Sequence, residues 1–194
     1  IALMSDTLDS SRQWMSLQAE ANNASFEGLD GIDISLEDIN VEINRTTASE
    51  FIDYSKTTVE VNTGDNLVTF DMEGELTKLS ADVNLELFDF FGVNGGFAFE
   101  KSTQNLKLND GNSVDVDLLT FGANDVSAFA GLNYGSAQEI GLALGSVNLA
   151  FALMSEKNGR KWTALNASTS NASFNGLDGL KLSASDLEVI INQA

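Results

Sequence analysis

The acidic and amide side chains near position 110 have the types and spacing that best suit chemistry. Asp110, Asn112, Asp115 and Asp117 lie within the stretch LNDGNSVDVD. Carboxylate and amide oxygens gathered at a turn are the ligands that Ca²⁺ prefers. The spacing matches neither an EF-hand loop nor the glycine-rich calcium nonapeptide. An Asx turn beside a solvated strand face is therefore the alternative to a calcium site.

Two tryptophans stand in the same short motif. Trp14 follows Arg12, and Trp162 follows Arg160, in the pattern R-x-W-x-x-L-x-A. The Trp and the following Leu lie an odd number of positions apart, so on a strand they face opposite sides. Each indole is a candidate contact for a sugar ring, for the neighbouring arginine, or for an adjoining repeat. The motif therefore marks a candidate ligand-binding or inter-repeat surface.

The composition excludes several kinds of catalytic site. The chain of 194 residues has no histidine and no cysteine, which removes Ser-His-Asp and Cys-His catalysis, disulfides, and zinc sites built on imidazole or thiolate. A carboxylate pair for glycoside cleavage remains, but 29 acidic residues make a chance pair easy. We therefore expect no enzymatic activity. A polysaccharide-active enzyme on a β-solenoid is the less favoured alternative.

The charge balance limits the partners. The formal net charge is -19, whereas nucleic-acid binding needs a basic surface and anionic membranes attract basic segments. No apolar run approaches the roughly 18 residues that a membrane-spanning helix needs. We therefore expect neither nucleic acid as a partner nor membrane insertion.

A long internal repeat dominates the chain. Residues 12–44 and 160–192 align without a gap, with 17 of 33 positions identical, and the phrase ALMS precedes both copies. A fixed period indicates repeat architecture, with one full unit over residues 1–150 and the start of the next over 151–194. Phrases that resemble one another begin at Asp38, Asp82 and Asp125. They suggest sub-units at roughly 1–50, 51–95 and 96–150.

The repeated phrase alternates with the period of two that is typical of strands. Apolar residues fall on even positions from 32 to 36 and on odd positions from 39 to 43. In the second copy the alternation changes phase at the equivalent position. This change of phase predicts a β-bulge at Asp38 and at Asp186. Asp30-Gly31 and Asp178-Gly179 suit tight hairpin turns. Similar alternation recurs over 57–62, 66–74 and most of the later chain.

These patterns predict an all-β fold with repeat architecture. We expect an elongated β-solenoid or a stacked β-sandwich, built from sub-units of about 45 residues. A solenoid pairs each rung with the next and so protects the strand edges. Partners would then include neighbouring repeats, or copies of the chain joined end to end.

The phrases ALMS, R-x-W-x-x-L-x-A, ASF-x-G-L-D-G and D-[IL]-x-V-x-I-N resemble the long, degenerate repeats of giant bacterial surface proteins. Those repeats occur near hemolysin-type calcium-binding and adhesin regions. The resemblance implies an extracellular or cell-surface location and a stalk or filament that serves attachment or cell-cell contact. It assigns calcium to no residue, because the calcium nonapeptide is absent. The alternative is a glycan-binding or surface-binding module that uses the tryptophans and the acidic strand faces.

Overall fold

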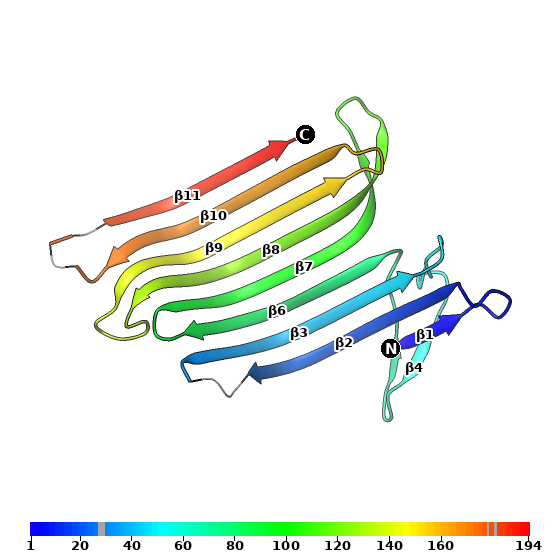
Figure 1. Ribbon diagram of the computed structural model, residues 1–194, viewed down its shortest axis with the longest axis horizontal. Coiled ribbons are helices and arrows are strands. Elements are labelled where there is room, and N and C mark those ends of the chain that lie inside the picture. Colours follow the sequence, from blue (N-terminus) through cyan, green and yellow to red (C-terminus); the bar gives the residue numbers. More distant parts are fainter. Residues whose placement is uncertain (27–29, 178, 181) are drawn as a thin grey trace.

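The computed structural model describes residues 1–26, 30–177, 179–180 and 182–194. The chain forms one large antiparallel sheet of nine strands and a separate two-stranded hairpin (Figure 1). The strands are β1 (Ala2–Ser5), β2 (Gln13–Phe26), β3 (Ile32–Thr46), β4 (Glu60–Asn62), β5 (Leu67–Thr69), β6 (Leu76–Leu87), β7 (Phe91–Lys107), β8 (Ser113–Leu132), β9 (Ile140–Ser155), β10 (Lys161–Asn175) and β11 (Leu182–Gln193). The predicted all-β fold is confirmed.

The sheet order follows the chain, β1-β2-β3-β6-β7-β8-β9-β10-β11. Each strand pairs with its chain neighbours in antiparallel ladders, and only the excursion over residues 47–75, with β4 and β5, leaves the order. The strands are therefore joined as hairpins and spread into an open sheet in Figure 1. The expected sub-unit boundaries near positions 95 and 150 fall inside β7 and β9, and the sub-units stay a prediction.

The two copies of the repeated phrase pair in the same way. In the first copy Met4 lies opposite Trp14, and in the second Met154 lies opposite Trp162. The ALMS strand thus occupies one register against the R-x-W strand in both places. The connecting loop is two residues longer in the first copy, and the pairing absorbs this difference. Strand β1 therefore corresponds to the end of β9, β2 corresponds to β10, and β3 corresponds to β11.

A line of backbone irregularities crosses the sheet, and we call it the crease. Its residues have positive φ angles: Asp38 (49°), Gly95 (144°), Asp125 (50°), Ser146 (50°) and Asp186 (53°). The ladder registers shift at three places along it: between β3 and β6, between β7 and β8, and between β8 and β9. Asp38 and Asp186 are the two positions at which the alternation slips. A positive φ in a bulge changes the phase of a strand, so apolar residues on both sides of the crease share one face.

Strand β6 defines the two faces of the sheet, because it alternates without a break from Lys78 to Leu87. One set of its side chains is apolar, namely Leu79, Ala81, Val83, Leu85 and Leu87, and the other is polar, namely Lys78, Ser80, Asp82, Asn84 and Glu86. Cross-strand partners share a face. We call the two sides the apolar face and the polar face.

The excursion over residues 47–75, which we call the lobe, packs against the sheet at β1, β2, β3 and β6. Its core consists of Tyr54, Phe70 and Met72, which are 2–5% exposed, and Ala2 and Leu76 of the sheet pack against this core. The rings of Tyr54 and Phe70 lie 5.2 Å apart, a distance typical of favourable aromatic pairs. The lobe therefore has a hydrophobic core of its own.

A polar network connects the lobe to β2 and β3. Asn44 and Ser16 are fully buried, and the Ser16 hydroxyl bonds to both Asn44 Oδ1 and the Tyr54 hydroxyl. Asn44 Nδ2 donates to the carbonyls of Ile52 and Gly74, at 2.9 and 2.8 Å. The two carbonyls belong to opposite ends of the lobe, so a single side chain holds both ends to the sheet.

A smaller aromatic cluster covers glycines at the other end of the sheet. The rings of Phe129 and Tyr134 stack with centroids 5.1 Å apart, and Tyr134 lies over Gly92, where a Cβ would collide with its ring. Burial raises the pKa of the Tyr134 phenol above its ordinary value, and Glu86 and Glu139 raise it further. The cluster keeps this phenol neutral at a pH where an exposed tyrosine ionises.

Tyr134 should therefore lower the stability of the fold at alkaline pH. Its contribution is fully present below the unfolded pKa of about 10 and is lost as the pH rises through the folded pKa. We expect the ultraviolet absorbance of tyrosinate to show this late ionisation. Tyr134→Phe should remove the late transition and reduce the loss of melting temperature between pH 9 and 11. A Tyr134→Phe titration identical to that of the unaltered chain would contradict the assignment.

Candidate functional site

The acid-rich turn near position 110 uses its oxygens internally. The backbone and side-chain N–H groups of Asn112 donate to Asp110 at 2.9 Å each, and these bonds lower the pKa of the Asp110 carboxyl. Asp115 accepts from Asn105 at 2.6 Å, and Asp117 follows on the same side of β8. Within the part of the chain that the structure describes, no group of three or more His, Cys, Asp or Glu is placed to hold a metal ion. The geometry at Asp110 is that of an Asx turn.

Both tryptophans of the repeated motif are covered by their own arginines. The guanidinium carbon of Arg12 lies 5.4 Å from the ring centroid of Trp14, and Arg160 lies at the same distance from Trp162. Both indoles are half-buried, and Trp14 Nε1 donates to the Glu50 carbonyl at 2.8 Å. A sugar would have to displace the arginine to stack on the same ring face.

The repeated turn falls between the paired strands in both copies. Gly31 has a φ of 81° and Gly179 a φ of 78°, a conformation that glycine adopts without strain. Asp30 precedes Gly31 in the turn from β2 to β3. Asp178, predicted to do the same in the second copy, lies outside the described residues. At these two turns the glycines supply the backbone geometry that a tight connection needs.

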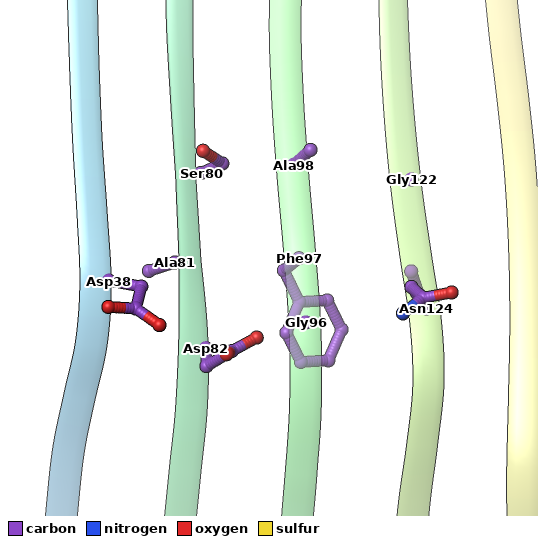
Figure 2. A pocket seen from close by; sticks show the side chains of 10 residues that line it. Asp38, Ser80, Ala81, Asp82, Gly96, Phe97, Ala98, Gly122 and Asn124 are labelled. Atoms are coloured by element: carbon purple, nitrogen blue, oxygen red, sulfur yellow. The ribbon is translucent and has the colours of Figure 1, made fainter.

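The polar face is hollowed along the crease (Figure 2). A hollow of 310 Å³ is lined by Asp38, Asp82 and Asn124, with Gly96 between the last two. A second hollow of 380 Å³ shares three of these residues and adds Asp125. A Cβ at Gly96 would lie 3.0 Å from Asp82 Oδ1, so the glycine leaves room for this carboxylate.

These hollows offer carboxylates and amides to a hydroxyl-bearing or cationic ligand. The 44- and 43-residue spacing of Asp38, Asp82 and Asp125 was the signal that could have located this site. The sequence pattern pointed to related sub-units instead. In the structure the three aspartates lie at one level of the sheet. Asp38 and Asp82 are on the neighbouring strands β3 and β6, and Asp125 is on β8, which β7 separates from β6.

The apolar face is the most extensive candidate surface. The backbone irregularities of the crease keep it continuous from the row through Leu79 to the row through Leu87, and no second layer formed by the described residues covers it (Figure 1). Several of its large side chains are exposed to 39% or more: Phe26, Leu79, Phe121, Leu142, Leu153, Leu182, Leu187 and Val189. Soluble chains seldom expose a contiguous apolar area of this kind unless it binds something.

No family model matches the chain, and neither a curated protein nor a solved structure is detectably similar to it. Among the described residues there is no helix that is long and apolar enough to span a bilayer.

Proposed function

We propose that the chain is a structural repeat module of a long secreted or cell-surface protein, and that it works as a stalk or filament in attachment or cell-cell contact. The observation that carries the proposal is the identical pairing of ALMS with the R-x-W strand in both copies. It implies that β2, β3, β6, β7, β8 and β9 form one unit, after which the same arrangement begins again at β10.

The far ends of the two hairpins support the same period. Phe26 lies opposite Ile34, and Phe174 lies opposite Leu182, with both partners 148 positions apart. In this proposal neighbouring repeats are the partners, and each unit extends the sheet by further antiparallel strands. The free edge of β11 corresponds to the edge of β3 that pairs with β6.

The docking site of the lobe also has a counterpart in the second copy. Asn192 and Ala164 occupy the places of Asn44 and Ser16, and they are paired in the same way. They line an open groove of 570 Å³, whereas Asn44 and Ser16 are covered by the lobe. The groove thus presents the surface that a second lobe would need.

The glycan-binding alternative is weaker for a geometric reason. It relies on Trp14 and Trp162, whose ring faces carry Arg12 and Arg160. Both oxygens of Asp110 already accept a hydrogen bond from Asn112. A mechanical role requires no ligand at these places, and it requires no catalytic group.

A tandem chain tests the proposed period. Residues 5–154 repeated in series join Met154 to Ser5, which recreates the native Met154-Ser155 junction. Six strands at about 4.8 Å each should lengthen the particle by about 29 Å per unit. Electron microscopy of two, three and four units should show this constant increment.

Copies of residues 1–194 joined directly are the matched control. Their junction leaves two residues between β11 and a following β1. Because β1 and β11 point the same way in the sheet, antiparallel pairing there turns the next unit over and sets its polar face beside the apolar face of the unit before. We expect no constant increment from these copies. Compact particles from the tandem of residues 5–154, with no growth along one axis, would refute the repeat module.

A further inference from the structure

The apolar face carries almost no charge. The described residues on this face, from the row through Val41 and Leu79 to the row through Ile32 and Leu87, include no charged side chain apart from residues of the crease itself. Apart from Arg45, which lies beyond these rows, the charged side chains of β3 and β6 lie on the polar face or in the crease, and Glu42 and Lys78 form an ion pair there at 3.1 Å. Two apolar faces can therefore meet while the acidic side chains of both chains remain in water.

One row of the apolar face has a regular relief. It reads Ala81, Phe97, Ala123, Leu149, Ala167 and Val189 on strands β6 to β11, whereas the adjoining row from Leu79 to Ile191 is large throughout. Small and large residues alternate from strand to strand, so knobs and holes repeat about every 10 Å, the width of two strands. Facing sheets pack by interdigitating their inner side chains, and this row is complementary to itself after a shift of one strand.

The area of the face is sufficient for a stable interface. The strands from β2 to β11 in the large sheet span about 38 Å at about 4.8 Å per strand, and β3 from Ile32 to Val41 spans about 31 Å. The face thus covers about 1,200 Å² at these spacings. A standard protein-protein interface uses about 800 Å² of each partner.

We propose that the apolar face binds the same face of a second copy of this chain, forming a two-layer β-sandwich. The second copy is favoured by the available area, by the outward position of the charges and by the one self-complementary row. Aligned packing of the two sheets would place Phe121 and its neighbours in a core about 10 Å thick. This inference does not rest on the proposed stalk function, since edge extension and face pairing use different surfaces.

The mass in solution tests the proposal. We expect light scattering to give the mass of two chains, and Ala123→Glu to reduce it to that of one, with at least a tenfold weaker association. Ser127→Glu adds the same charge on the exposed polar face of the same strand and should keep the two-chain mass. A one-chain mass for the unaltered protein, or equal masses for the two variants, would overturn the pairing.

Thiol labelling provides a second measurement that does not depend on a destabilising charge. The chain contains no cysteine, so a single introduced thiol reports on one site. Ala123→Cys should react with a maleimide slowly at high protein concentration and rapidly after dilution, whereas Ser127→Cys should react rapidly at both. Equal rates for the two thiols, with a multi-chain mass, would mean that copies join through strand edges, and would refute face pairing.

A lipid surface is the remaining alternative for an apolar face. Flotation with neutral phosphatidylcholine vesicles tests it directly. We expect the protein to stay in the aqueous fraction, because the second copy already covers the face. Flotation of a one-chain species would assign the face to lipid and would overturn the sandwich.

Discussion

Replacing Asn44 with alanine is expected to release the lobe from the sheet. The substitution removes two donated hydrogen bonds and leaves the carbonyls of Ile52 and Gly74, together with the Ser16 hydroxyl, short of partners in a buried site. Each buried polar group left unpaired costs about 1–3 kcal/mol. We expect a loss of about 3 kcal/mol in the free energy of unfolding, which chemical denaturation measures.

Asn192→Ala is the matched control, because Asn192 holds the equivalent place in the second copy and is exposed. It should change the free energy of unfolding by less than about 0.5 kcal/mol. Trypsin can also report the release, since Lys56 is the only basic residue of the lobe. Cleavage after Lys56 should accelerate in Asn44→Ala alone. Equal stability and equal cleavage for the two variants would show that Asn44 does not anchor the lobe.

Gly141→Ala is expected to destabilise the sheet where β8 and β9 turn back. A Cβ at Gly141 would collide with the Ala130 carbonyl and lie 2.7 Å from both the Gly131 Cα and the Phe129 ring. Two of these obstacles are backbone atoms of the paired strand, and they cannot move without breaking the ladder. Overpacking of this kind costs about 1–3 kcal/mol or more.

Gly122→Ala tests the same chemical change in β8 at a roomy position. A Cβ there would meet only the Leu149 carbonyl, at 3.8 Å. This substitution should leave the melting temperature unchanged or raise it, because alanine loses less backbone entropy than glycine on folding. Thermal unfolding of the two variants side by side decides the matter. A comparable loss in both would attribute the effect to glycine flexibility instead of the close backbone approach.

The sequence was sufficient to predict strands and part of the crease. Ile34 and Leu36 alternate in one phase and Ile39 and Val41 in the other, and the positive φ of Asp38 lies between them. In β8 and β9 the same change of phase is hidden, because small residues such as Ala123 fit either face. The crease there is revealed by the positive φ angles of Asp125 and Ser146 and by the ladder registers.

The alternation of apolar and polar residues predicts neither the open sheet nor the lobe, for two different reasons. Alternation is the same whether a strand pairs with its chain neighbour in a hairpin or with the next turn of a solenoid, so period alone does not choose between them. The strands at 60–62 and 67–69 alternate like the others, although they leave the sheet. Asn44 and Ser16, which hold the lobe, look like ordinary outward-facing polar residues until their burial is known.

The candidate site residues likewise include some that the sequence predicts and some that it does not. The motif predicts the arginines beside Trp14 and Trp162 as one kind of stacking partner, and the structure places them there. Predicting the hollow at the crease requires the strand order. Asp38, Asp82 and Asp125 come close together because β4 and β5 lie outside the large sheet and β3 pairs with β6. Predicting the apolar face also requires the strand order and the position of every β-bulge, because each bulge changes which residues of a strand point to that face.

Strands β1 and β11 lie at opposite edges of the sheet, and the two ends of the chain are found there (Figure 1). A pull between those ends acts across the strands, so it loads the hydrogen bonds of one ladder at a time. Such a sheet peels strand by strand at low force, whereas a pull along the strands would shear many bonds together. A tether made of these units would yield gradually under tension and recover its length when the load is removed.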